Sequence, residues 1–250
     1  MRGMSALGKL RAILEERLAL MAPARRLRLR EAERALGARS GGLRLLDAGC
    51  GDGLLTLALA KRHPDWTLLG IDLREDLLAG ARERARARGL GNVEFRQADL
   101  LQPLTVGHDF EAVIALECLS EIPDDKTALR SMFGAAAPGA VLAVQVPDRE
   151  WRPVLPGSAT TWREQVRQGY TAADLGALLT STGLKRVETR GTYRSLAAAA
   201  QEIRDRIKGA PLPVRLLAFP FLAAAVRLEA KGITWGRPNA IFAMGRRPAQ

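Results

Sequence analysis

A short glycine-rich segment constrains the fold of this chain more than any other feature. Residues 45–54 read Leu-Leu-Asp-Ala-Gly-Cys-Gly-Asp-Gly-Leu, so an apolar run ends at an acid and enters a turn with three glycines. Glycine lets the backbone adopt left-handed conformations and approach a ligand closely. A buried strand that passes through such a turn into a helix predicts a ligand-binding α/β sheet.

The spacing of the glycines narrows the class of ligand. A dinucleotide-binding turn has the pattern G-x-G-x-x-G and would need its third glycine at position 54, where this chain has Leu54. The chain has G-x-G-x-G instead, and no Gly-Lys-Ser/Thr follows, which excludes a P-loop. A ligand without a pyrophosphate therefore fits this turn better.

Two further acids follow the next two predicted strands. Asp72 ends the second strand, where a carboxylate can accept hydrogen bonds from both hydroxyls of a ribose. Asp99 follows the third strand and can accept from an adenine amino group while Leu100 packs on the base. Three acids at three successive strand ends predict a nucleoside-binding edge.

Alternating apolar strands and helices predict an α/β fold with a parallel sheet covered on both faces. The strands are expected at Leu43–Asp47, Trp66–Asp72, Val93–Gln97, Phe110–Leu116, Ala140–Val146, Lys185–Thr192 and Asn239–Met244. The intervening helices are expected at about 53–62, 74–88, 125–135 and 172–182.

Helical segments flank this core. Residues 1–40 are expected to form a helical extension, with helices at about 5–20 and 24–37, that acts as a lid. Residues 41–250 then form the α/β domain. It carries a helical insertion at about 194–236, in which Pro211 and Pro213 separate helices at 195–208 and 214–230.

From about Leu43 to Val146 the chain resembles class I S-adenosylmethionine-dependent methyltransferases that act on small molecules and lipids. This resemblance implies a Rossmann-like, seven-stranded, mostly parallel sheet. It also implies S-adenosyl-L-methionine as cofactor and S-adenosyl-L-homocysteine as product. The cofactor-binding residues that it implies are Asp47, Ala48, Gly49, Cys50, Gly51, Gly53, Asp72, Leu73, Asp99, Leu100 and Leu116.

The resemblance also indicates candidate catalytic residues. Residues 115–124 read Ala-Leu-Glu-Cys-Leu-Ser-Glu-Ile-Pro-Asp, similar to a family segment that often contains L-E-H-[IV]-P-D. Glu121 occupies the usual histidine position and is the first candidate for a general base. Glu117 is the second candidate, with holding the methionine end of the cofactor as its alternative role. A solvated loop charge is the other interpretation of Glu121.

Aromatic and arginine side chains follow the fifth predicted strand. The candidate substrate residues are Trp151, Arg152, Trp162 and Tyr170, in a chain with only 5% aromatic residues. Such side chains suit an acceptor with a flat or anionic part. A loop anchored by buried tryptophans is the equal alternative.

The net charge of +11 is unevenly distributed. Residues 1–40 and 201–250 each carry +6, so residues 41–200 carry −1. We expect a small or lipid-linked acceptor, anionic or membrane-borne, with arginine-rich codon bias as the competing explanation. A second hypothesis is an RNA methyltransferase. The chain lacks the motif [ND]-P-P-[YF] after the fourth strand, and nucleic acid is therefore not an expected partner. A cofactor-binding protein with cyclising or lost activity is a third.

Apolar segments and cysteines bear on localisation and metals. The longest apolar run, Leu216–Val226, is broken by Pro220 and is too short to span a bilayer. The insertion at 212–229 is therefore expected to be a lid over the acceptor pocket or a helix lying on an anionic bilayer. We expect a cytoplasmic protein, with or without contact to the inner face of the membrane. In that compartment Cys50 and Cys118 are expected to be reduced thiols. Two cysteines and two histidines are too few soft ligands for a structural zinc site, so no metal is expected.

Overall fold

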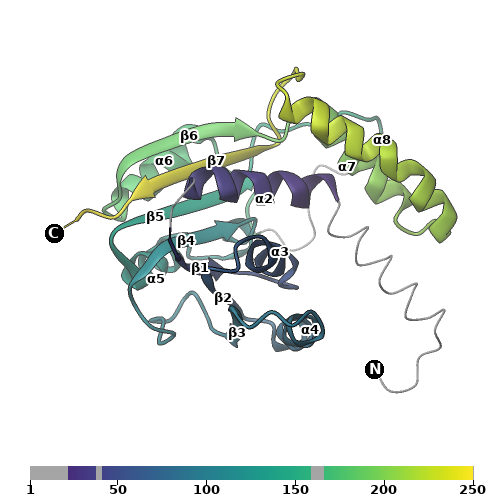
Figure 1. The fold of residues 1–250 in the computed structure, drawn as a ribbon. Helices are drawn as coiled ribbons and strands as arrows, with labels where there is room; N and C mark the ends of the chain where they lie inside the picture. Colours follow the sequence, from purple (N-terminus) through teal and green to yellow (C-terminus); the bar gives the residue numbers. More distant parts are fainter. Residues whose placement is uncertain (1–21, 38–40, 159–165, 250) are drawn as a thin grey trace. The chain divides into compact units, whose positions relative to one another are not determined.

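The computed structural model describes residues 22–37, 41–158 and 166–249 (Figure 1). Contacts divide the chain into two compact units. Among the described residues, unit 1 contains 22–27, 153–158 and 193–237, and unit 2 contains the rest. The helix expected at 5–20 and the candidate substrate residue Trp162 lie outside the described residues.

Unit 2 contains a seven-stranded sheet with strand order β3-β2-β1-β4-β5-β7-β6. The strands β1 to β5 pair in parallel, and β7 runs antiparallel to both β5 and β6. This arrangement confirms the mostly parallel, Rossmann-like sheet. The strands are β1 (Arg44–Ala48), β2 (Thr67–Asp72), β3 (Val93–Gln97), β4 (Phe110–Leu116), β5 (Ala136–Pro147), β6 (Lys185–Thr192) and β7 (Ala240–Arg246).

Helices cover both faces of this sheet, as expected (Figure 1). α3 and α4 pack near β2 and β3, α5 packs on β4 and β5, and α6 packs on β6 and β7. The helices outside the insertion are α2 (Pro23–Leu36), α3 (Leu54–Arg62), α4 (Glu75–Ala87), α5 (Asp125–Ala135) and α6 (Ala172–Ser181). A short 3₁₀ turn, η1 (Leu119–Glu121), follows β4.

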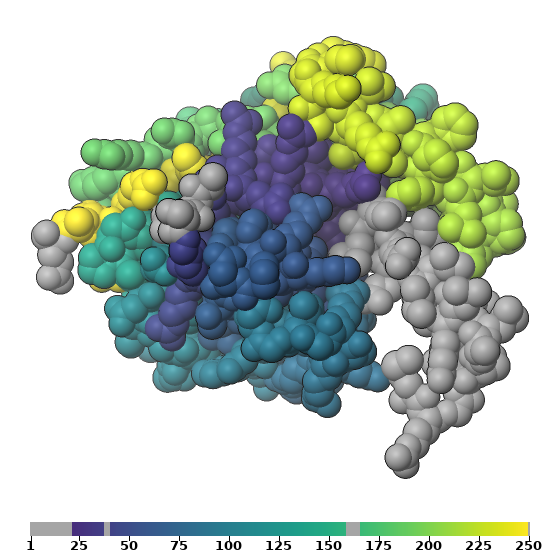
Figure 2. Space-filling model, in the orientation of Figure 1, coloured from purple at the N-terminus to yellow at the C-terminus, as the bar shows by residue number. Residues whose placement is uncertain are grey.

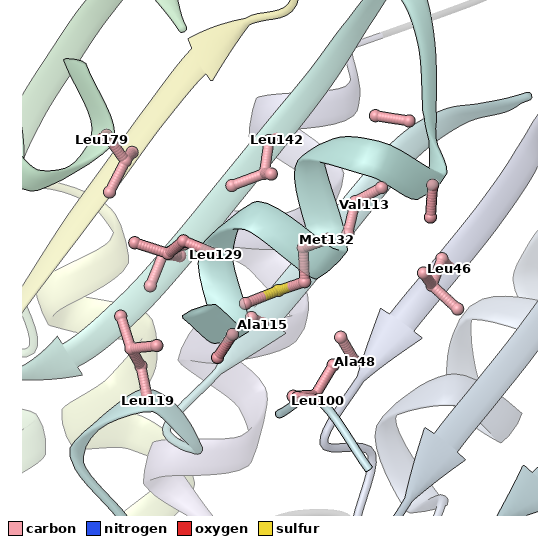
Figure 3. Packing of buried hydrophobic residues seen from close by; sticks show 14 of the residues in the cluster. Leu46, Ala48, Leu100, Val113, Ala115, Leu119, Leu129, Met132, Leu142 and Leu179 are labelled. Carbon is pink, nitrogen blue, oxygen red and sulfur yellow. The ribbon is translucent and has the colours of Figure 1, made fainter. Parts of the chain in front are cut away.

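The main core of unit 2 lies between the sheet and the helices α5 and α6 (Figure 3). Val113 and Ala115 of β4 are fully buried in the same cluster as Met132 of α5. Their spacing is the two-residue period of a strand, which places every second side chain on one face. Because both faces of the sheet are covered, the intervening residues Ala112 and Ile114 are fully buried as well.

β5 is longer than predicted. β5 begins at Ala136 instead of Ala140, because Pro138 and Gly139 form an irregularity within the strand and not the turn that they indicate. The pairing with β4 shifts register there, and Gly139 has a φ of 79°. Such an irregularity lets a strand absorb residues that cannot follow the regular ladder.

Unit 1 contains the two helices predicted for the insertion, α7 (Ser195–Ile207) and α8 (Leu212–Ala230). The Glu229 carboxylate of α8 accepts from the backbone N–H groups of Arg194 and Ala197, at 2.6 and 2.9 Å. A carboxylate at the positive end of a helix dipole is stabilising. Within the described ranges, no helix is long and apolar enough to cross a membrane.

Candidate cofactor site

The glycine turn lies where the order of the strands reverses. β2 and β3 lie on one side of β1, and β4 lies on the other. Ligands of such sheets bind in the crevice at the carboxyl ends of the strands at this switch point. Gly49 marks the junction, since a Cβ added there would lie 2.5 Å from the Cβ of Cys118, which follows β4.

The three glycines of the turn serve different purposes. Their φ angles of 74°, 56° and 68° at Gly49, Gly51 and Gly53 lie in the left-handed region, which a residue with a Cβ enters at a cost. A Cβ at Gly53 would lie 2.7 Å from both Ala81 and Phe95, so this glycine permits packing within the protein. A Cβ at Gly51 would meet nothing within 4 Å, so this glycine borders open space that a ligand can enter.

Asp72 lies at the tip of β2, as predicted, and connects that strand to the turn. Its Oδ2 accepts from the backbone N–H of Gly51 at 2.7 Å, and its Oδ1 accepts from that of Arg74 at 3.0 Å. Each oxygen retains a lone pair, because a carboxylate oxygen can accept two hydrogen bonds. Asp72 is therefore oriented by the backbone and still able to accept from a ligand.

Asp47 is buried and reaches α3. Its side chain is 2% exposed, and its Oδ2 accepts from the Thr56 hydroxyl at 2.6 Å. Desolvation raises the pKa of Asp47 to about 6, and the hydrogen bond from Thr56 partly offsets this rise. The carboxylate thus holds the end of β1 against α3. Asp47 therefore supports a ligand site indirectly, by fixing the position of the glycine turn.

The residues predicted to contact the adenine follow β2 and β3 and differ in their exposure. Asp99 is partly exposed, and its Oδ1 accepts from the N–H of Leu101 at 2.8 Å. Leu100 is buried in the core beside Ala48 (Figure 3). Leu73 is 62% exposed next to Asp72. Leu73 therefore offers more exposed apolar surface to a base than Leu100 does, and the packing of Leu100 on a base stays a prediction.

A polar cluster follows β4 and β5. The Glu117 Oε1 accepts from the Gln145 amide at 2.6 Å and lies 3.9 Å from the Nε of Arg28 in α2. Glu117 has a φ of 75°, a conformation that costs energy for a residue with a side chain and that occurs often at functional sites. Leu116, just before it, is buried.

Three buried polar atoms near the ends of β4 and β5 are available to bind a ligand. Arg28 Nε, Gln145 Oε1 and Ser120 Oγ have no hydrogen-bond partner in the described part of the chain. Unsatisfied buried groups of this kind are costly and rare. Arg28 and Gln145 were not predicted as site residues, although Gln145 is the one polar residue in the apolar segment Ala-Val-Leu-Ala-Val-Gln-Val.

Glu121, the other candidate catalytic residue, ends η1 with an exposed side chain. The two cysteine thiols nearby are less accessible. The Cys118 thiol donates to the carbonyl of Ala48 at 3.2 Å, and burial raises the pKa of Cys118 and of Cys50 well above the ordinary range. Neither cysteine has the character of a reactive thiolate. No metal-binding cluster of side chains occurs among residues that the structure describes.

The described candidate substrate residues lie in two environments: Tyr170 is buried and hydrogen-bonded, whereas Trp151 and Arg152 lie in the loop after β5. Tyr170 is 4% exposed and donates to Asp125 at 2.8 Å, while Arg167 donates to the carbonyls of Ile122 and Pro123 at 2.9 and 2.7 Å. These hydrogen bonds hold the segment after η1 against residues 167–170. Trp151 is partly buried, with an indole N–H that has no partner in the described ranges. The exposed Arg152 donates to the Trp151 carbonyl at 2.7 Å.

The fold and this site define a Rossmann-like α/β protein with a ligand site at the switch point of the sheet. A family model described as a methyltransferase domain matches residues 39–191. The chain therefore belongs to this methyltransferase-domain family, in agreement with the resemblance to class I S-adenosylmethionine-dependent methyltransferases.

Individual relatives agree with this assignment. A trans-aconitate 2-methyltransferase from Methylobacterium radiotolerans is 34% identical over 163 residues, which are 63% of this chain and 57% of that protein. A ubiquinone biosynthesis O-methyltransferase from Methylococcus capsulatus is 38% identical over 46% of this chain and 47% of that protein. The match thus spans about half the length of these relatives.

A solved structure extends the range of chemistry found on this fold. The structure of the [4+2]-cyclase SpnF is similar with a TM-score of 0.61 and 25% sequence identity. The similarity covers 84% of this chain and 77% of the cyclase. The fold alone therefore does not specify the reaction, which has to be argued from the residues of the site.

Proposed function

We propose that this protein is an S-adenosylmethionine-dependent methyltransferase that methylates a small, acid-bearing acceptor. One observation carries the proposal: Asp72 is oriented by the N–H of Gly51 beside a turn that is open at Gly51. That geometry suits a ribose against the Asp72 carboxylate and a backbone cradle for the rest of the cofactor.

The residues present fit this cofactor along the sheet edge. Asp72 would accept from the ribose hydroxyls, Leu73 would cover one face of the adenine, and Asp99 would accept from its amino group. The turn from Gly49 to Gly53 and the cluster around Glu117 would hold the methionine part. When bound, S-adenosylmethionine supplies an electrophilic methyl group on a sulfonium sulfur.

The protein's contribution is alignment and, for a protonated acceptor, proton removal. Holding the acceptor in line with the methyl group lowers the barrier by removing the entropic cost of the encounter. Glu117 is engaged by Gln145 and lies near Arg28, which favours an orienting role over that of a base. Glu121 is exposed at the end of η1, and we assign it the base, an effect of about 10²–10⁴-fold.

The proposed acceptor class rests on charge and on the relatives. Arg28 and Arg152 are guanidinium groups in unit 2 that can pair with a carboxylate. The relatives named for trans-aconitate and for ubiquinone biosynthesis illustrate two acceptor types, a small acid and a lipid-linked ring. The small acid fits the arginines better, and a lipid-linked acceptor is the alternative.

A methyl-transfer assay tests the proposal. The full chain is incubated with S-adenosylmethionine labelled in the methyl group and with trans-aconitate as the first probe, followed by other dicarboxylates and tricarboxylates. We expect label in the acid fraction. The carboxylates of trans-aconitate are already ionised at neutral pH and need no base, so Glu121→Gln should lower kcat, with little change in KM, only for an acid that is methylated on a hydroxyl group. Label only in a lipid-linked acceptor would replace the small-acid proposal by its alternative.

The similarity to a cyclase supports a second candidate function, a cofactor-dependent reaction without methyl transfer. In that case the protein binds S-adenosylhomocysteine but transfers no label to any acceptor. This outcome would contradict methyl transfer while retaining the cofactor site.

A further inference from the structure

α8 of unit 1 is apolar on two faces, but only one of them is covered. Leu222, Ala223 and Val226 form the buried face, and Val226 packs against Ala197 of α7. A helix that is apolar all round is normally buried on all sides. The uncovered apolar face of α8 is therefore a candidate binding surface.

The uncovered face carries large apolar side chains in a single stripe. Leu217 is 74% exposed and Phe221 is 77% exposed, and Val214 and Leu228 are exposed as well. These four positions are separated by three, four and seven residues, so they lie on one side of the helix. We call them the exposed apolar stripe. Figure 2 shows α8, in yellow-green, at the molecular surface.

The loop after α8 adds two exposed apolar side chains on a fixed backbone. Trp235 is 61% exposed and Ile233 is 51% exposed. The carbonyl of Trp235 accepts from the Ser195 hydroxyl, and that of Gly236 accepts from Arg194 at 3.0 Å. The backbone of Trp235 is thus held in place while its side chain is largely exposed, and exposed apolar groups that form a continuous patch mark interaction sites.

The positive charge of the sequence around α8 favours an anionic partner. Residues 203–237 carry seven basic and two acidic side chains, a net charge of +5. Lys208 and Lys231, at either side of α8 in the sequence, are exposed. Apolar side chains with an aromatic anchor and a positive surround match the interface of an anionic bilayer, where each basic group near the surface strengthens binding.

We propose that the exposed apolar stripe of α8, with Ile233 and Trp235, docks this protein on an anionic lipid surface. α8 then lies in the plane of the interface, with its covered face on α7. Basic residues such as Lys208 and Lys231 contact the lipid headgroups. This inference is independent of methyl transfer and of the cofactor site.

Vesicle flotation with the full chain tests the inference. The wild type should float with vesicles of equal parts phosphatidylcholine and phosphatidylglycerol and remain unbound with phosphatidylcholine alone. The Leu217→Glu/Phe221→Glu variant should lose tenfold or more in partitioning, on the order of the effect of removing two buried apolar side chains. Lys208→Gln and Lys231→Gln should each weaken binding by about fivefold.

A matched control separates the stripe from net charge. Ala79→Glu/Ala87→Glu adds the same two charges at exposed positions of α4 and should float like the wild type. All variants change exposed side chains, so circular dichroism and thermal unfolding should match the wild type. Flotation that survives Leu217→Glu/Phe221→Glu, or a wild type that binds no anionic vesicles, would overturn the inference. A wild-type dimer that this variant converts to a monomer, without vesicle binding, would assign the stripe to a second copy of the chain.

Discussion

The glycine turn permits an experiment that separates ligand binding from folding. Three glycines with positive φ angles are changed to alanine one at a time: Gly49, Gly51 and Gly89, with φ of 74°, 56° and 62°. Each change forces a Cβ into the left-handed region, at about 1–2 kcal/mol. The three sites differ in what the new methyl group meets within the protein and in whether they belong to the glycine turn.

The surroundings of each glycine set the magnitudes. At Gly49 the methyl group would lie 2.5 Å from the Cβ of Cys118, which adds about 1–3 kcal/mol of overpacking. At Gly51 and at Gly89 it would meet nothing within 4 Å. For a chain of this size, 1 kcal/mol corresponds to about 2–4 °C in Tm. Gly49→Ala should therefore lower Tm by about 5–15 °C, and the other two by only a few degrees.

Binding should separate the two open sites. Calorimetry with S-adenosylhomocysteine should show about ten- to hundredfold weaker binding for Gly51→Ala, because the methyl group occupies space at the ligand. Gly89→Ala should bind like the wild type, since Gly89 follows the C-terminal end of α4 and does not belong to the glycine turn. Wild-type affinity in Gly51→Ala would refute the role of the open turn as a cradle.

Three further predictions concern the supporting residues. Because burial raises the pKa of Asp47 from 3.8 to about 6, the folded state holds a proton that the unfolded state has lost, so the free energy of unfolding should fall by about 2 kcal/mol as pH rises from 4 to 6. In denaturant titrations Asp47→Asn should lack this fall, and equal slopes for both proteins would contradict the assignment. Arg167→Ala should cost about 1–3 kcal/mol by loss of the hydrogen bonds to two carbonyls, measured as a shift in denaturant midpoint. Cys50 and Cys118 are partly buried, and their raised pKa values keep the thiols protonated, so both should react slowly with a thiol reagent at pH 8 in the native protein and faster once it is unfolded; equal rates in the two states would contradict the raised pKa values.

The strands and the acidic strand ends could be predicted from the sequence, because apolar runs bounded by glycines and acids carry a local signal. β3, β4 and β6 match their predicted bounds, and Asp72 lies at the tip of β2 as expected. Pro138 and Gly139 misled the prediction of β5, since a proline–glycine pair indicates a turn unless a neighbouring strand accommodates it.

Contacts between distant segments could not be predicted in this way. Leu100 and Leu73 each follow a strand end, and only the packing shows that Leu100 faces the core while Leu73 is exposed. The approach of Glu117 to Gln145 depends on the pairing of Leu116 with Gln145 across two parallel strands. That register follows from the order of the strands, which the amino-acid pattern alone does not specify.

The central claim is that the sheet edge around Asp72 binds S-adenosylmethionine. Calorimetric titration of the full chain with S-adenosylhomocysteine tests it most directly, with Asp72→Ala as the variant. Loss of two hydrogen bonds to a charged acceptor should weaken binding by about a hundredfold or more. Asp72→Asn, which keeps one acceptor oxygen, should lie between the two. Absence of binding to the wild type, or equal affinity in Asp72→Ala, would contradict the account.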